Sequence, residues 1–239
     1  RHLQVPVQQH LLRRRRVAAP APNGTKAAQL LCHSGPGKSL AHRLQRGTRV
    51  PLVTRPRPYF PANTVLHVLN RGNERRRLFT DAMDYRRFVQ LLAHTQRRVP
   101  MRLLAYALMP NHWHLVAWPS SARELSHFMQ RLCWRHAADV RTRTDTVGNG
   151  HVYQGRYRAF LIRSQVHYFR VMRYVEANPL RAGLVSRAED WQWSSLHERL
   201  HEWRLICAGP EHLPALEQWL EEVNRPMTPE EVAQARWRR

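Results

Sequence analysis

The chain has 239 residues, a net charge of +22 at pH 7 and a pI of about 11.5. No apolar run is long enough to cross a bilayer, which excludes a membrane-spanning protein. The three cysteines are far apart, which excludes a disulfide framework and a zinc knuckle; they are Cys32, Cys133 and Cys207. The excess positive charge predicts a polyanionic partner, most often a nucleic acid; a coding bias is the alternative, since 37 of the 39 basic residues are arginine.

Residues 1–58 differ in composition from the rest of the chain. They contain 12 basic residues and no acidic or aromatic residue. A segment of this kind buries too little apolar surface to offset the entropy lost on ordering, so we predict a disordered basic extension. Translated upstream sequence is an open alternative for part of it. The remaining 27 basic and 17 acidic residues leave residues 59–239 with a net charge of +10, so the excess persists where the chain is expected to fold.

Hydrophobic periodicity after residue 59 predicts alternating strands and helices. Strand-like runs are residues 65–70, 101–109, 112–118 and 153–162. Helical runs begin after caps at Thr80, Ser121 and Ser164 and extend to about residues 97, 140 and 177. The order predicts an α+β, ferredoxin-like βαββαβ sheet followed by one more helix. In this arrangement we expect the hairpin to supply central strands and one face of the sheet to stay open for a substrate.

Two histidines open the second strand of the predicted hairpin, directly after the Pro110-Asn111 turn. Side chains alternate along a strand, so His112 and His114 point to the same face. Two imidazoles on one face can bind one divalent cation. The motif alone is weak, and two ordinary strand histidines remain the alternative.

The last predicted helix carries Tyr174 and Asn178, four residues apart and beside its buried stripe. At this spacing the two side chains can reach the same point in space. Pro179 disfavours helical backbone at Asn178, so we expect the helix to end there. A surface tyrosine is the alternative for Tyr174, and Tyr168 is a rival nucleophile that falls on the buried stripe.

Basic and aromatic side chains follow two of the predicted strands. Arg71, Arg75, Arg156 and Arg158 suit contacts with backbone phosphates, although a solvated loop is the alternative. Tyr153, among the basic residues of the fourth strand, can stack on a splayed base.

Four segments resemble the REP-associated tyrosine transposases, a branch of the HUH single-tyrosine transposases. They are residues 66–73 (LHVLNRGN), 105–115 (AYALMPNHWHL), 153–157 (YQGRY) and 173–185 (RYVEANPLRAGLV). Each is modest alone, but four in this order are specific. The resemblance implies a transposase domain over residues 59–196; it leaves out residues 1–58, and residues 197–239 read as a helical tail.

The resemblance implies an endonuclease that cleaves and rejoins single-stranded DNA through a 5′-phosphotyrosine intermediate. Tyr174 matches the family's nucleophile. His112 and His114 match its metal-binding pair and Asn178 its third ligand, for Mg2+ or Mn2+. Two alternatives share the basic surface: a non-catalytic, domesticated DNA-binding protein on the same fold, and a metal-dependent nuclease that uses water.

The resemblance also implies partners and a location. Single-stranded or hairpin DNA is the expected substrate, and the expected place is the bacterial cytoplasm, on the nucleoid. We expect no membrane contact. A homodimer and a monomer both stay open, and the sequence does not predict the target DNA sequence.

Overall fold

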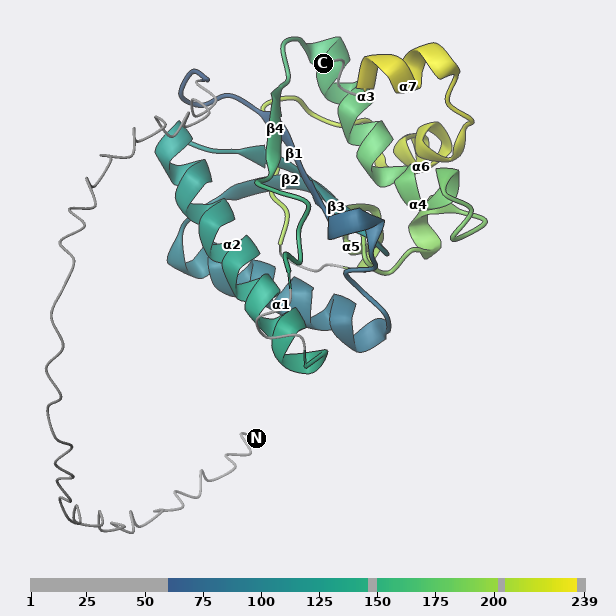
Figure 1. Cartoon of the computed structure of the whole chain (residues 1–239). Helices are drawn as coiled ribbons and strands as arrows, with labels where there is room; N and C mark the ends of the chain where they lie inside the picture. The colour runs from purple at the N-terminus through teal and green to yellow at the C-terminus, as the bar shows by residue number, and fades with distance from the viewer. Residues whose placement is uncertain (1–59, 146–149, 202–204, 236–239) are drawn as a thin grey trace, which may run out of the picture. The chain divides into compact units, whose positions relative to one another are not determined.

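The computed structural model of the chain describes residues 60–145, 150–201 and 205–235 (Figure 1). The predicted basic extension over residues 1–58 lies outside them. The elements follow in the order β1 (Leu66–Arg71), η1 (Asn73–Arg75), α1 (Ala82–Arg98), β2 (Arg102–Met109), β3 (His112–Trp118), α2 (Ala122–Arg143), β4 (Arg158–Leu161), α3 (Gln165–Glu176), α4 (Asn178–Arg181), η2 (Ala188–Asp190), α5 (Ser195–His201), α6 (Leu216–Asn224) and α7 (Pro229–Ala235). This is the predicted α+β order of strands and helices.

The four strands form one antiparallel sheet in the order β2-β3-β1-β4. The prediction that the hairpin supplies two central strands is therefore wrong for β2, which lies at an edge. The reason is that β1 pairs with β3 on the side away from β2, so that β1 and β3 occupy the centre. The β2 edge is partly covered, because Trp193 and Cys207 form backbone hydrogen bonds with Leu108 and Leu103.

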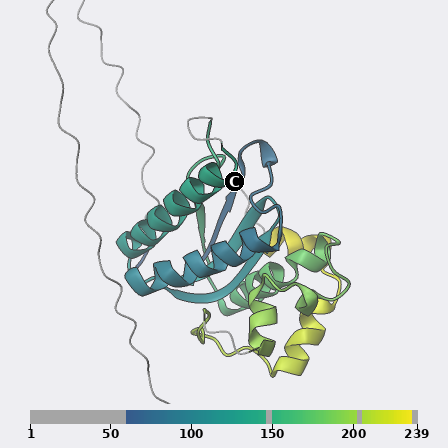
Figure 2. The same cartoon turned by 90° about the horizontal axis from the view of Figure 1, so that it is seen from below.

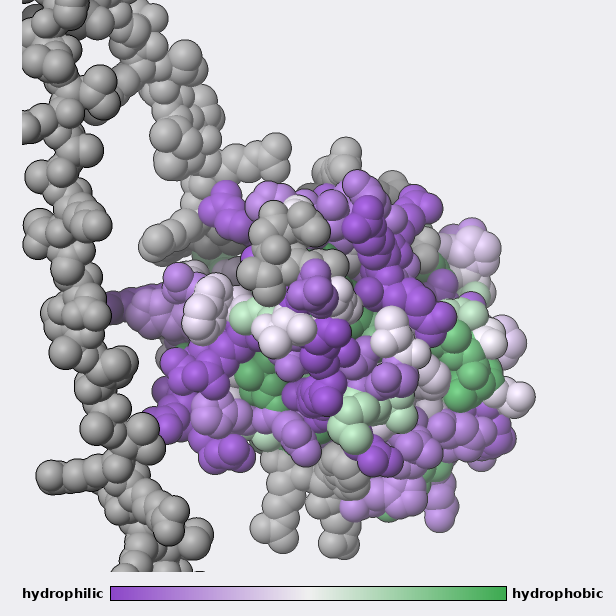
Figure 3. Space-filling view, turned by 60° about the horizontal axis from the view of Figure 1, so that its bottom comes forward, coloured by the Kyte–Doolittle hydropathy of each residue, from purple (hydrophilic) through white to green (hydrophobic). Residues whose placement is uncertain are grey.

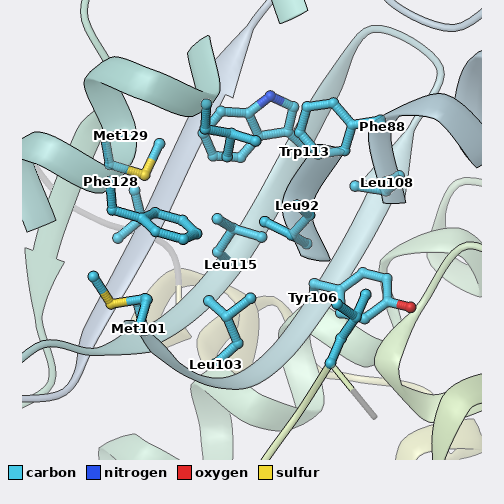
Figure 4. Close-up of a cluster of buried hydrophobic side chains, with 14 of the residues drawn as sticks. Phe88, Leu92, Met101, Leu103, Tyr106, Leu108, Trp113, Leu115, Phe128 and Met129 are labelled. Atoms are coloured by element: carbon cyan, nitrogen blue, oxygen red, sulfur yellow. The ribbon is translucent and has the colours of Figure 1, made fainter. Parts of the chain in front are cut away.

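One face of the sheet packs against α1 and α2 and forms the larger core (Figure 4). Alternate residues of the strands point into it, among them Leu103, Trp113 and Leu115. The apolar stripes of the helices supply side chains such as Phe88 and Phe128, which are fully buried. The periodicity of the sequence thus predicted both the helices and the face that they bury.

Local capping chemistry sets where the helices begin. The Ser121 and Ser164 side chains accept hydrogen bonds from the first turns of α2 and α3, as predicted. The predicted Thr80 cap is wrong: Asp81 caps α1 by accepting from the Asp84 backbone N–H. The Thr80 hydroxyl instead donates to the Asp84 carboxylate at 2.7 Å, because that carboxylate turns back over the start of the helix.

The other face of the sheet is covered where an open face was expected. Helix α3 packs against β2 and β3, on the side opposite α1 and α2 (Figure 2). Val171 and Val175 of α3 belong to a second core with Leu104, Ala105 and Val116 of the sheet. The prediction fails because α3 is apolar around more than one stripe, and its burial needs the sheet on one side and further helices on the other.

A buried carboxylate joins α3 to the helices that follow it. Glu176 is fully buried and accepts hydrogen bonds from the Ser195 hydroxyl at 2.6 Å, the Arg199 guanidinium at 3.0 Å and the Trp219 indole at 2.6 Å. These partners come from α5 and α6, so the end of α3 is held by groups far along the chain.

A buried guanidinium makes the second connection. Arg173 donates to the backbone carbonyl oxygens of Glu222 at 2.6 Å and Arg225 at 2.7 Å, and it pairs with the Glu231 carboxylate at 2.9 Å. The segment read from the sequence as a helical tail therefore packs on α3 through α6 and α7.

The surface is mostly polar on the side that Figure 3 shows, with separate apolar patches between hydrophilic residues. Among the described residues, no helix is both long and apolar enough to cross a bilayer. Even α2, which has 22 residues, carries charged side chains along its length.

We expect Glu176→Ala to lower the free energy of unfolding by about 3 kcal/mol, because it leaves a largely buried guanidinium and two other donors without their shared acceptor. Urea denaturation measures the loss. Glu217→Ala removes an exposed glutamate of α6 and is the matched control, with an expected change under about 0.5 kcal/mol. Equal losses in the two variants would contradict an anchoring role for Glu176.

Candidate active site

The predicted histidine pair lies at the start of β3 and faces the side of the sheet that α3 covers. His112 is opposite Arg71 and His114 is opposite Leu69 in the ladder with β1. The two ring centroids are 5.0 Å apart and the ring planes are nearly perpendicular. His112 is half-buried and His114 is buried, so the pair runs from the surface inward.

A third histidine, His67 of β1, contacts the inner member of the pair. Its Nε2 is 2.9 Å from Nδ1 of His114, and the two rings are stacked with centroids 5.0 Å apart. Burial, with a smaller contribution from the charge of His167, lowers the pKa of His67 to about 4, so the ring is neutral at pH 7. His67 was not among the residues predicted for the site. Alternation places it on one face with Arg71, but its nearness to His114 depends on β1 pairing with β3.

Tyr174 of α3 completes a cluster of three rings with His67 and His114. Its ring centroid is 5.8 Å from that of His114 and 6.0 Å from that of His67, and both contacts are edge-on. The Arg181 guanidinium lies 5.0 Å from the Tyr174 centroid. The side chain is only 4% exposed. The expected position beside the buried stripe is wrong, because the sheet and the later helices together cover more of α3 than one stripe.

Asn178 follows Tyr174 by one turn, as the spacing predicted. Helix α3 ends at Glu176, and Asn178 opens the short helix α4 with Pro179 behind it. The Asn178 amide nitrogen donates to the Tyr174 backbone carbonyl at 2.9 Å. Since the nitrogen of the amide is used in this way, Oδ1 is the atom that can act as a ligand.

The four predicted arginines fall into two groups. Arg71 lies opposite His112, and Arg158 lies opposite Leu69 across β1 and β4, so both are on the histidine face. Arg75 and Arg156 are exposed in η1 and in the loop before β4. The predicted strand over residues 153–162 is shorter than expected, so Arg156 precedes it.

The predicted role of Tyr153 in stacking on a base is contradicted. Its side chain is buried in the core beneath α1 and α2. Its hydroxyl accepts from the Trp113 indole at 3.1 Å and lies 2.5 Å from Nδ1 of His136. Burial also raises the pKa of Tyr153 well above the ordinary value. His136 is likewise buried in this core.

The donor set limits which metal the residues could hold. Within the described residues, no three His, Cys, Asp or Glu side chains are grouped so as to hold a metal ion. The candidate ligands are two imidazoles and one amide oxygen. With metal–nitrogen bonds of about 2.1 Å, two perpendicular rings with centroids 5.0 Å apart are compatible with one shared ion. Neutral nitrogen ligands suit Mn2+ better than Mg2+, which prefers oxygen.

The chain is similar to proteins of known kind. A REP-associated tyrosine transposase from Escherichia coli (strain K12) is 26% identical over 141 residues, which cover 59% of this chain and 81% of the relative. A solved structure of a REP-associated tyrosine transposase bound to a REP hairpin aligns with a TM-score of 0.48 and 18% identity, over 68% of this chain and 99% of the other.

A family model described as "Transposase IS200 like" matches residues 62–178. The matched range begins just before β1 and ends at Asn178, so it contains the three histidines and Tyr174. The family match and the candidate site therefore lie on the same stretch of the chain. Over residues 62–178, the part that carries the candidate site, the chain matches the IS200-like transposase family.

Proposed function

We propose that this protein cleaves and rejoins single-stranded or hairpin DNA, with Tyr174 as the nucleophile. The observation that carries the proposal is the edge-on contact between Tyr174 and His114, with ring centroids 5.8 Å apart, although the two residues are far apart in the sequence. The match to a transposase family model supports DNA as the substrate, and the element and strand orders support a ferredoxin-like sheet.

In the proposed reaction the Tyr174 hydroxyl oxygen attacks a backbone phosphorus. A bond forms between the phenol oxygen and phosphorus, the bond to the 3′ oxygen breaks, and the phenolic proton is lost as the 3′-OH gains one. The DNA is left joined to the protein by a 5′-phosphotyrosine link. Attack by a 3′-OH on this link reverses the step, so strands are rejoined without another energy source.

His112, His114 and Asn178 are the residues that would hold a divalent cation, Mn2+ or Mg2+. A cation there would polarise the phosphoryl oxygens. The protein's own contribution is placement: β3 fixes both imidazoles, and α3 with α4 fixes the phenol and the amide. Reacting groups that are already oriented lose less freedom on the way to the transition state.

Basic residues lie at the exposed end of the site. The loop after β1 is tied to the turn before His112, because the Asn111 carbonyl accepts from the Gly72 backbone and the Asn111 amide donates to the Arg75 carbonyl at 3.2 Å. This brings Arg71 and Arg75 to the half-buried end of the histidine pair. We infer that the DNA backbone approaches the site from this end.

A non-catalytic DNA-binding protein on the same fold is the second candidate. The burial of Tyr174, at 4% exposure, favours it, since an attacking hydroxyl must meet its phosphate. This candidate needs the arginines but neither Tyr174 nor a cation. Formation of a covalent protein–DNA adduct separates the two functions.

We expect Tyr174→Phe to abolish the covalent adduct with a hairpin oligonucleotide in the presence of Mn2+, because the attacking oxygen is gone, while DNA binding is retained. Denaturing electrophoresis measures the adduct and gel shift measures binding. Tyr168→Phe, a buried tyrosine of the same helix, is the control and should form the adduct. An adduct with Tyr174→Phe would contradict the assignment, and none with the unchanged protein would favour the second candidate.

Salt dependence tests the phosphate contacts. The double variant Arg75→Gln/Arg156→Gln should reduce the slope of log affinity against log salt by about 1.4, because each lost contact to a single strand removes about 0.7. The control is Arg97→Gln/Arg98→Gln, two exposed arginines at the end of α1. Equal slopes for the two double variants would exclude the proposed approach of the DNA.

A further inference from the structure

His67 has no place in the donor set described above, yet its ring is within hydrogen-bond distance of one of the candidate ligands. Its Nε2 lies 2.9 Å from Nδ1 of His114, and both side chains are buried, at 3% and 4% exposure. A hydrogen bond between two rings in such surroundings is worth more than at the surface, because water does not compete for it.

The direction of this hydrogen bond decides what His114 can bind. A neutral imidazole has one N–H and one lone pair. If Nδ1 of His114 donates to His67, the lone pair of His114 is on Nε2, the nitrogen that can then ligate a cation. If His67 donates instead, the proton of His114 is on Nε2 and blocks that nitrogen.

We propose that His67 is a positioning residue for the site: its Nε2 accepts the Nδ1–H of His114 and so keeps His114 in the tautomer whose Nε2 can bind a divalent cation. The inference rests on the proposed function, in which His114 is a metal ligand. Hydrogen-bond partners of this kind fix the tautomer and the ring orientation of ligating histidines in other metal sites.

The fold holds His67 firmly enough for this role. It lies on β1, a central strand paired with β3 on one side and β4 on the other. It is opposite Val116 and hence diagonal to His114, at the distance where large side chains meet across strands. The Phe160 ring at 6.3 Å and the Tyr174 ring at 6.0 Å pack edge-on against it.

His67 also packs against the candidate nucleophile. Its ring contacts both Tyr174 and His114, which are themselves in edge contact. The three rings therefore fix one another's positions. A ring at residue 67 sets the spacing between the phenol and the inner imidazole, and the acceptor nitrogen sets the tautomer, so the two contributions can be tested separately.

Two substitutions separate these contributions in the full chain. His67→Phe keeps an aromatic ring but removes the acceptor, and His67→Gln places an amide oxygen near the position of Nε2. We expect the affinity for Mn2+, measured without DNA by calorimetry, to fall 10- to 100-fold in His67→Phe and to stay close to that of the unchanged protein in His67→Gln. His136→Phe replaces a buried, hydrogen-bonded histidine on the opposite face and should leave the affinity unchanged.

The tautomer is measured directly by long-range 1H–15N spectra of the metal-free protein labelled at histidine. We expect the His114 proton on Nδ1 in the unchanged protein, and a mixture of tautomers in His67→Phe. A proton on Nε2 of His114 in the unchanged protein would overturn the proposal. So would Mn2+ binding by His67→Phe as tight as that of the unchanged protein, provided that thermal unfolding shows both to be folded.

Failure of the proposed function looks different. If the unchanged protein binds Mn2+ and shows the expected tautomer but forms no DNA adduct, the strand-transfer reaction is refuted while the role of His67 stands. If the unchanged protein binds no Mn2+, the metal site is refuted, and His67 is then not a positioning residue for it.

Discussion

The geometry of the candidate active site depends on one constraint: α3 must lie across β2 and β3 so that Tyr174 contacts the histidines. Apolar packing holds the helix to the sheet, and two buried charges, Glu176 and Arg173, connect its other sides to α5, α6 and α7. A buried charge is tolerated only with its partners in place. The later helices are therefore part of what positions the candidate nucleophile.

The strand order has a comparable effect on the histidines. In the order β2-β3-β1-β4, the strand that follows the turn at Asn111 has β1 as a neighbour, which brings His67 beside His114. Had β1 added to the outer edge of β2, His67 would lie two strands away. The placement of three imidazoles and a phenol in one cluster thus follows from topology more than from local sequence.

Local chemistry was predictable from the sequence, and distant packing was not. The caps at Ser121 and Ser164 and the shared face of His112 and His114 depend on residues within a few positions, and all are as expected. The burial of Tyr153 and Tyr174 depends on elements distant in the chain, α1 and α2 in one case and the strands β1 and β3 in the other. The hydrophobic periodicity of a helix predicts one buried stripe. It cannot show that a second layer of the structure covers the remaining surface of that helix.

The buried ion pairs of α3 fix the register of this helix on the sheet as well as stabilising the fold. The sheet residues packed against α3 include Ala105, Ala107 and Val116. Because these side chains are small and apolar, they do little to stop α3 from shifting along the sheet. A slip by one turn, about 5.4 Å, would keep much of the apolar contact and yet carry Tyr174 past His114. It would also pull Glu176 from donors fixed on other helices, at a cost of several kcal/mol. An apolar residue at 176 could preserve the fold, but only the Arg173 connections would then fix the register that brings the phenol to the imidazoles.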